Sequence, residues 1–172
     1  KRYYSGKKKM FALKTQMASG EDHYILAISE SVPGATHDKT LSDSVHTIDH
    51  LPDGCEVDAD KGYQGLAKQV DLVTVINLET GETQDVARLQ VRTPYKKPKG
   101  GELSEEQLAF NSLLNAIRVR VEHCIGWAKN WAILANRFRC AHSIYTSIFR
   151  TICGLVNLQT LRWQAAKASN SA

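Results

Sequence analysis

The feature that most constrains the fold is a long amphipathic helical pattern that starts near Ser104. Five apolar residues recur along it at spacings of three and four: Leu114, Ile117, Val121, Ile125 and Ala128. Such spacing places all five on one face of a helix, where they form a buried stripe. Ser104 and Gln107 fit a capping box, in which each side chain bonds to the backbone N–H of the other residue. The pattern therefore predicts one long helix with a defined start.

Short β-forming runs separated by turn residues fill the first part of the chain. Residues 10–19 alternate loosely between apolar and polar, and Tyr24–Ser29 is a more continuous apolar run. With the turn residues between them, they predict an antiparallel hairpin whose second strand is the more fully buried. Thr36–His50 carries apolar residues at helical spacing and predicts a helix. A strand that ends at Asp60 is expected to follow it.

The remaining elements are predicted less uniformly. Leu66–Val70 fits a short helix, Asp71–Ile76 a strand and Val91–Tyr95 a short strand, while the polar stretch 79–90 has no clear pattern. A second long helix is expected from about Ser143. Strands interspersed with helices are typical of an α/β fold.

Length and composition favour one ordinary domain, which we expect over residues 1–165 with a disordered tail at 166–172. No apolar run approaches the roughly 20 residues that cross a bilayer, so we expect no membrane partner and a cytoplasmic location. Four scattered cysteines without a C-x-x-C pair argue against a disulfide framework and against a zinc knuckle. They are Cys55, Cys124, Cys140 and Cys153.

The net charge is only +4, but basic residues gather in clusters on either side of an acidic stretch between Glu30 and Asp60. Basic patches beside an acidic pocket suit a polyanion held around a metal site, whereas solvated surface lysines are the alternative. The basic clusters include Lys7, Lys8, Lys9, Lys96, Lys97, Lys99, Arg118 and Lys129.

Two acidic residues are the candidates for chemistry. Asp60 lies at the end of a predicted strand and before a Gly-containing turn, which is where ligands gather in α/β sheets. Asp58 points to the same side of that strand, so spacing alone does not choose between them. Glu122 lies beside the buried stripe, four residues after Arg118. A surface Arg118–Glu122 pair is the alternative.

Gly126 lies one helical turn after Glu122, in the middle of the predicted helix. A glycine there costs about 1 kcal/mol relative to alanine. Its presence therefore suggests the close approach of another chain or a ligand.

Five motifs occur in a defined order and together cover nearly the whole chain. They are Tyr4-Ser-Gly-Lys-Lys-Lys9, Pro33-Gly34 followed by His37-Asp38, Asp60-Lys-Gly-Tyr-Gln-Gly65, Tyr95-Lys-Lys-Pro-Lys-Gly-Gly101, and Arg118-Val-Arg-Val-Glu-His123 with Gly126 and Lys129. This ordered set resembles the catalytic domain of DDE transposases of bacterial insertion sequences, the group related to eukaryotic Harbinger elements.

The resemblance implies a ribonuclease-H-like mixed sheet flanked by helices, and the cutting and joining of DNA ends. In the family, three carboxylates hold two Mg²⁺ (or Mn²⁺) ions. The motif match makes Asp60 the second carboxylate, because Gly62-Tyr63 follows it, and makes Glu122 the third. The implied partners are the transposon ends and the target DNA, bound by a homo-oligomer in the bacterial nucleoid. The basic residues fit this picture as phosphate contacts, which bind DNA with little sequence preference. The leading candidates are Lys7, Lys8, Lys9, Lys96, Lys97 and Lys99, and Arg118 and Lys129 are candidates to hold phosphates near the metals.

One departure from the family pattern concerns the first carboxylate. The family places it before the Tyr-Ser-Gly-Lys-Lys-Lys motif, and no acid occurs here before Glu21. We therefore expect the first strand and first metal ligand to be missing, as in a C-terminal fragment or a decayed copy, and little cleavage by this chain alone. A degenerate or domesticated DNA-binding protein and a ribonuclease-H-like nuclease unconnected with mobile elements are the alternatives.

Five further residues are interpreted structurally. His37 and Asp38 fit the N-terminus of a helix, although the family motif leaves a supporting role open. His123 points about 100° away from Glu122 around the helix, which favours packing. Trp127 and Trp131 are expected in a core or an interface rather than as base-stacking platforms.

Overall fold

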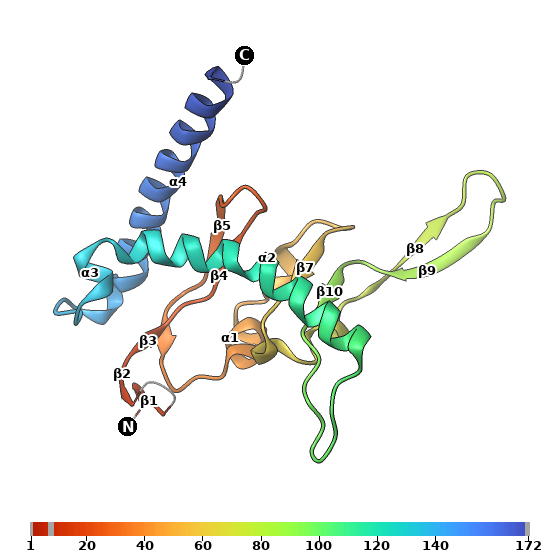
Figure 1. Cartoon of the computed structure of the whole chain (residues 1–172), viewed down its shortest axis with the longest axis horizontal. Helices are drawn as coiled ribbons and strands as arrows, with labels where there is room; N and C mark the ends of the chain where they lie inside the picture. The colour runs from red at the N-terminus through yellow and green to blue at the C-terminus, as the bar shows by residue number, and fades with distance from the viewer. Residues whose placement is uncertain (1, 7–8, 171–172) are drawn as a thin grey trace. The chain divides into compact units, whose positions relative to one another are not determined.

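The computed structural model describes residues 2–6 and 9–170, which form a mixed α/β architecture (Figure 1). The chain divides into two compact units. The first unit combines Lys1–Thr36 with Val119–Ala172, and the second is His37–Arg118. The long helix expected from Ser104, α2 (Glu105–Lys129), begins in the second unit and ends in the first.

The strands of the first unit are short and pair as antiparallel ladders: β1 (Tyr4–Ser5) with β2 (Met10–Phe11), β3 (Leu13–Lys14) with β6 (Val32–Pro33), and β4 (Met17–Ser19) with β5 (Ile25–Ile28). The β4–β5 pair confirms the predicted hairpin. The expectation that β5 is more fully buried was wrong, since only Ile25 is buried and Leu26 is 65% exposed. In a two-stranded ladder, each strand has a neighbouring strand along only one of its edges, so much of β5 stays open to solvent.

Helices complete the first unit. After α2 come α3 (Ala132–Ala135), η4 (His142–Ile144) and α4 (Tyr145–Ser169), where η denotes a 3₁₀ helix. The helix expected from about Ser143 is thus confirmed. Because α4 continues to Ser169, it includes residues 166–169 of the expected tail. No helix within the described residues combines the length and the apolar character needed to cross a membrane.

The core of the first unit lies where α2 and α4 pack against β5. Its buried members are Ile25, Cys124, Ala128, Ile152, Cys153 and Val156. Cys124 is completely buried and its Sγ lies 3.2 Å from the carbonyl oxygen of His23. The helical periodicity correctly predicted that Ala128 is buried, but it did not include Cys124 in the buried face. None of the four cysteines forms a disulfide, as expected.

A buried asparagine ties α4 to the sheet. The Asn157 side chain accepts a hydrogen bond from the Ile25 N–H at 2.8 Å and donates one to the Ile25 carbonyl at 2.9 Å. Both groups belong to a strand that enters the core, where an unpaired backbone group costs about 1–3 kcal/mol. The amide of Asn157 thus replaces the missing neighbouring strand at this point.

The second unit begins with α1 (Asp38–Ser44) and η1 (Thr47–His50). The sequence predicted one helix over Thr36–His50, but His46 adopts a left-handed conformation (φ 50°) and separates the two. Then follow β7 (Glu56–Asp58), η2 (Lys61–Tyr63) and η3 (Leu66–Gln69). The predicted strand therefore ends at Asp58, two residues earlier than expected.

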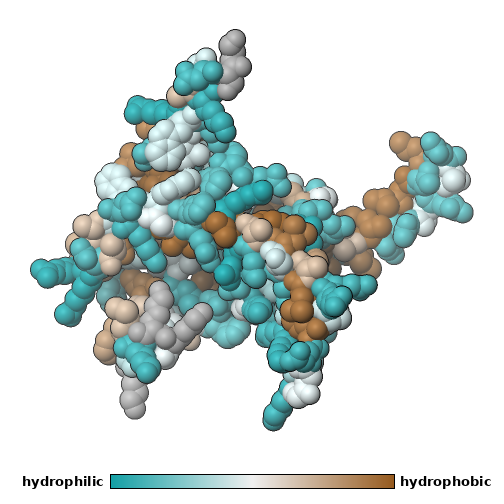
Figure 2. Space-filling view, in the orientation of Figure 1, coloured by the Kyte–Doolittle hydropathy of each residue, from teal (hydrophilic) through white to brown (hydrophobic). Residues whose placement is uncertain are grey.

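Two ladders complete the second unit. β7 pairs in parallel with β10 (Gln90–Arg92), with Val57 opposite Val91. β8 (Leu72–Ile76) and β9 (Thr83–Ala87) form an antiparallel hairpin. The polar stretch that had no clear pattern thus supplies the second strand of this hairpin. Its apolar side chains are largely exposed, which Figure 2 shows along the extended arm.

The core of the second unit is small. Ile48, Leu66 and Leu89 are its buried members, and Tyr63 packs against them. Arg88 supports this core with hydrogen bonds to the carbonyls of Ile48 and Leu51, both at 2.6 Å. The Ile48 carbonyl also accepts from the Leu51 N–H at 3.2 Å, so Arg88 adds a second hydrogen bond there and ties the end of η1 to this core.

Taken together, the described residues form five two-stranded sheets and two long helices. The mixed α/β class expected from the sequence is confirmed. The capping box is confirmed as well, since Gln107 N–H donates to Ser104 Oγ and Ser104 N–H donates to Gln107 Oε1, both at 3.2 Å.

Replacing Asn157 by alanine tests the two hydrogen bonds by which α4 holds Ile25 of β5. We expect Asn157→Ala to lower the free energy of unfolding by about 2–4 kcal/mol, because it leaves two backbone groups unpaired in the core. Chemical denaturation followed by circular dichroism measures this change. Gln159→Ala, at an exposed position of the same helix, should change it by less than about 0.5 kcal/mol. Equal effects of the two substitutions would show that the hydrogen bonds of Asn157 do not stabilise the fold.

Candidate functional site

Asp60 occupies the turn that follows β7. Its backbone is extended (φ −70°, ψ 165°), and its Oδ1 accepts a hydrogen bond from the Lys61 N–H at 2.8 Å. The carboxylate therefore caps η2 rather than ending the strand. An aspartate caps a helix because it satisfies a backbone donor that has no partner within the helix.

Arg118 of α2 holds the same carboxylate. Its Nη1 lies 3.1 Å from Asp60 Oδ1, and both side chains are a little under half exposed. An ion pair with this exposure contributes no more than about 1 kcal/mol to stability. Its consequence is geometric, since it fixes the orientation of Asp60 relative to the helix.

Asp58 is engaged in a different interaction. Its two oxygens accept hydrogen bonds from Arg92 Nε at 2.6 Å and Nη2 at 2.9 Å. This bidentate bond raises the pKa of the Arg92 guanidinium above its ordinary value. Because both Asp58 oxygens are occupied by one cation, Asp60 is the more available of the two carboxylates.

Gly62 brings α1 against the turn after Asp60. A Cβ atom at this glycine would lie 2.6 Å from Asp38 Oδ2 and 3.0 Å from Asp38 Cβ. A larger residue here would make the Asp38 carboxylate rotate and its Cβ move by a few tenths of an ångström, and glycine avoids both adjustments. His37 caps α1 by accepting a hydrogen bond from the Lys39 N–H at 3.3 Å, which confirms the interpretation of His37. Asp38 is therefore packed against the candidate site as well as being the first residue of α1.

The pKa of the Tyr63 phenol reflects the nearby carboxylates of Asp38 and Asp60. This pKa is raised to about 12, first by burial and then by the negative charges of Asp38 and Asp60. A tyrosine is protonated at neutral pH at its ordinary pKa as well, so the shift reports the burial of Tyr63 and the nearness of the two acids. The sequence motif contained Tyr63, but nothing in its spacing indicated that two acids from separate elements lie near it.

Hydrogen bonds fasten the motif around Asp60 to the next stretch of chain. Gln64 Nε2 donates to the Pro94 carbonyl at 2.7 Å and lies 3.2 Å from Thr93 Oγ1. Asn111 of α2, which is buried, accepts from the Tyr95 N–H at 2.8 Å and donates to the Tyr95 carbonyl at 3.1 Å. These bonds therefore fix the position of Tyr95, from which the basic loop extends. Asn111 was missed because the apolar pattern does not include it.

The lysines of that loop, Lys96, Lys97 and Lys99, are all exposed. Lys97 Nζ contacts Glu102 Oε1 at 2.9 Å. In the first unit, Lys9 and Lys129 are exposed as well, and Lys9 has a positive φ of 50°. Lys7 and Lys8 lie outside the described residues.

Glu122 is exposed on α2, one helical turn after Arg118. The next residue, His123, stacks on His23 with ring centroids 5.5 Å apart and also contacts Trp127, which confirms its packing role. A Cβ atom at Gly126 would meet no atom of the described residues within 4 Å. The close approach expected at this glycine is therefore not made by the described part of the chain.

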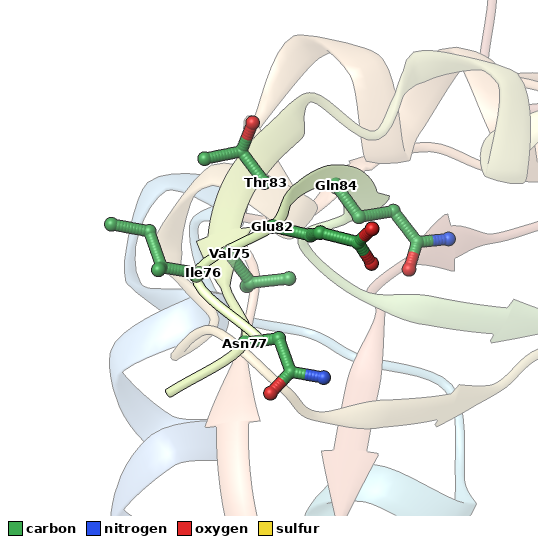
Figure 3. A pocket seen from close by; sticks show the side chains of 7 residues that line it. Val75, Ile76, Asn77, Glu82, Thr83 and Gln84 are labelled. Carbon is green, nitrogen blue, oxygen red and sulfur yellow. The ribbon is translucent and has the colours of Figure 1, made fainter. Parts of the chain in front are cut away.

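Among the described residues, no group of three or more His, Cys, Asp and Glu side chains is assembled as a metal site. A hollow at the tip of the β8–β9 hairpin contains none of the candidate residues (Figure 3). Its lining residues all come from that hairpin: Val75, Ile76, Asn77, Gly81, Glu82, Thr83 and Gln84. We attribute no chemistry to it, because it holds a single acid and no basic side chain.

Comparison with known proteins gives a consistent result. Residues 1–157 match the family described as "DDE superfamily endonuclease". The chain is 31% identical over 161 residues to a protein of Microchaete diplosiphon described as "Probable transposase for insertion sequence element IS702". That alignment covers 92% of this chain and 50% of the relative, so the chain spans about half the length of the curated relative it matches. No solved structure matches.

Alanine substitutions at two glycines should have opposite effects on stability. Gly62→Ala should lower the free energy of unfolding by about 1–3 kcal/mol, because the added methyl group overlaps Asp38 and forces α1 and η2 apart. Gly126→Ala should raise it by about 0.5–1 kcal/mol, because the methyl group meets open space in the middle of a helix. Urea denaturation measures both. A neutral or stabilising Gly62→Ala would show that Asp38 does not pack against the turn.

Proposed function

Because this chain belongs to the DDE superfamily endonucleases, we propose that it forms the catalytic part of an insertion-sequence transposase. The reaction is the cleavage of transposon DNA ends and their transfer to target DNA by in-line phosphodiester chemistry. The family match over residues 1–157 carries this proposal. The position of Asp60, in a turn directly after a strand of a parallel pair, supports it.

Asp60 and Glu122 are the carboxylates that would hold divalent metal, Mg²⁺ or Mn²⁺. Such ions prefer hard oxygen ligands and take few protein carboxylates. Asp60 fits this requirement, since its side chain is 46% exposed and both of its hydrogen bonds use Oδ1. When bound, two such ions activate the attacking hydroxyl and stabilise the leaving oxygen.

Arg118 restrains Asp60 through the contact to Oδ1. A guanidinium is also the side-chain group whose geometry best matches the oxygens of a DNA phosphate. Arg118 therefore has two roles in the proposal, which are to orient the carboxylate and to bind the phosphate next to it. The Tyr63 phenol is neutral at pH 7, as it would be at the ordinary pKa of tyrosine, so it adds no negative charge beside Asp60.

The residues assigned to DNA contacts are Lys9 and Lys129 in the first unit and, in the second unit, the loop that carries Lys96, Lys97 and Lys99. The hydrogen bonds of Asn111 to Tyr95 support this assignment, because they fix the point from which the loop extends. The Lys97–Glu102 pair is exposed, so a phosphate can replace Glu102 at little cost. Phosphate contacts of this kind position DNA without reading its sequence.

For the complete protein we place these elements in a ribonuclease-H-like arrangement. The antiparallel ladders of residues 10–33, the parallel β7–β10 pair and the long helix α2 support that placement. The complete enzyme acts on the transposon ends and the target as a homo-oligomer associated with the nucleoid.

The carboxylates are tested by single substitutions in the protein that carries this chain. We expect Asp60→Ala and Glu122→Ala each to reduce Mg²⁺-dependent cleavage of transposon-end DNA by more than about a hundredfold, because each removes a metal ligand. Gel analysis of labelled DNA ends measures the rate.

Asp71→Ala and Glu106→Ala are the matched controls, since both acids are exposed and lie outside the proposed site. Both should cleave at the rate of the unchanged protein. Unchanged cleavage by Asp60→Ala or Glu122→Ala would remove that residue from the site. DNA binding without cleavage by the unchanged protein would favour the degenerate DNA-binding alternative.

The basic loop is tested through the salt dependence of DNA binding. The double substitution Lys96→Ala with Lys99→Ala should weaken binding and reduce the slope of log K against log salt by about 2, because each lost phosphate contact removes about 0.9. Fluorescence anisotropy over a salt series measures the slope. Lys68→Ala, an exposed lysine of η3, serves as the control. An unchanged slope in the double variant would show that the loop does not contact phosphate.

A further inference from the structure

The β8–β9 hairpin of the second unit exposes apolar side chains that the proposed chemistry does not use. Leu72 is 66% exposed, Val75 44% and Ile76 62%, and Figure 2 shows apolar surface along this arm. Among the described residues, β8 pairs with β9 alone. A single two-stranded hairpin is marginally stable by itself in water. A partner strand beside β8 would cover these side chains and stabilise the hairpin.

The outer edge of β8 presents backbone groups to such a partner. The backbones of Asp71 and Asn77, on either side of β8, form hydrogen bonds to the β9 side of the hairpin at 2.9 Å and 2.8 Å. Backbone groups of an antiparallel strand point alternately to its two edges. The odd-numbered residues of β8 therefore face β9. The outer edge presents the N–H and C=O groups of Leu72, Thr74 and Ile76, which form a template for another strand.

The sequence of β8 suits pairing with a second copy of itself. It is Leu-Val-Thr-Val-Ile, which has nearly the same pattern in both directions from Thr74. In an antiparallel pair centred on Thr74, Leu72 lies opposite Ile76 of the second copy. Val73 likewise lies opposite Val75 of the second copy. Every outward N–H and C=O then has a partner, and the facing side chains are apolar pairs and one threonine pair, which stabilise a sheet.

The charges of the hairpin decide which partner fits. Residues 71–87 contain no lysine or arginine but four acids, Asp71, Glu79, Glu82 and Asp85. Such a segment repels the phosphates of DNA. All four acids lie outside Leu72–Ile76, so the pairing strand itself is uncharged. In the register centred on Thr74, Asp71 meets Asn77 of the second copy rather than an acid.

We propose that β8 pairs with β8 of a second copy across a two-fold axis at Thr74, which joins the two hairpins into one sheet. The interface belongs to the homo-oligomer of the proposed function, and the inference rests on that function in this respect alone. Both copies use the same patch, as in a closed two-fold dimer. The outer strands of the joined sheet are the two β9 strands. Each carries Asp85 and follows Glu82, so like charges oppose the addition of a third copy.

Introduced thiols test the interface and its register. The background is the full chain with Cys55→Ser and Cys140→Ser, which removes the two cysteines that are not buried. Opposite Cα atoms of a hydrogen-bonded pair lie about 5.5 Å apart, which a disulfide can span. We therefore expect Thr74→Cys to form a covalent dimer with oxidised glutathione, seen on a non-reducing denaturing gel.

Ile76→Cys on β8 and Gln84→Cys on β9 are the matched controls, because both positions are exposed. In the proposed register, the equivalent residues of the two copies lie too far apart at either position for a disulfide. Both variants should remain monomeric on the same gel. An absence of cross-linking by Thr74→Cys would overturn the inference, and so would equal cross-linking of the three variants.

A charge at the axis tests the same contact without a cross-link. Thr74→Lys places two like charges opposite each other and should raise the Kd of self-association by at least about tenfold. Gln84→Lys makes the same charge change on β9 and should leave the Kd unchanged. Sedimentation velocity over a concentration series measures both, and circular dichroism verifies folding. Unchanged self-association of Thr74→Lys would overturn the inference.

The failure of this interface is distinguishable from failure of the proposed function. Cleavage of transposon ends without cross-linking at Thr74→Cys refutes the interface and leaves the proposed function standing. Cross-linking in a protein that neither binds nor cleaves DNA supports the pairing of β8 and overturns the proposed function.

Discussion

The close contact between Gly62 and Asp38 is the constraint on which the candidate site depends. Asp60 lies in a short turn, and a turn by itself does not fix the direction of a carboxylate. The turn is held because α1 packs against Gly62, where an added Cβ atom would crowd the side chain of Asp38. His37 starts α1 at this place by capping it. The glycine of the motif therefore serves close packing, since its φ is not positive.

This packing also determines the electrostatics around Asp60. It brings the Asp38 carboxylate beside Tyr63, and burial together with the two acids keeps the phenol protonated. Arg118 supplies the opposite charge from α2. The second unit thus places two acids, a neutral donor and a cation around one turn. An arrangement of this kind can hold a carboxylate in position for a metal ion without first having to order it.

Buried amides hold the outer segments to the helices in both units. Asn157 pairs with both backbone groups of Ile25, and Asn111 does the same for Tyr95. Each amide supplies the donor and the acceptor that a neighbouring strand would otherwise provide. These side-chain hydrogen bonds hold a very short strand in the first unit and the start of an extended loop in the second at defined points of a helix. In the second case, the loop carries lysines that are assigned to DNA contacts.

The sequence by itself determined the local features and the family. The capping box at Ser104, the β4–β5 hairpin and the two long helices follow from interactions between near neighbours, which propensity and spacing record. Ordered motifs likewise indicated the family and made Asp60 the candidate, where strand spacing alone had left Asp58 open. Only the tertiary structure decided that Arg92 occupies Asp58, that Arg118 holds Asp60, and that Asp38 packs onto Gly62. It also showed that Cys124 and Asn111 are buried, and that α1 ends at Ser44. These outcomes depend on groups between 24 and 58 residues apart or on the packing of whole elements, and no local pattern encodes which distant partner a side chain will meet.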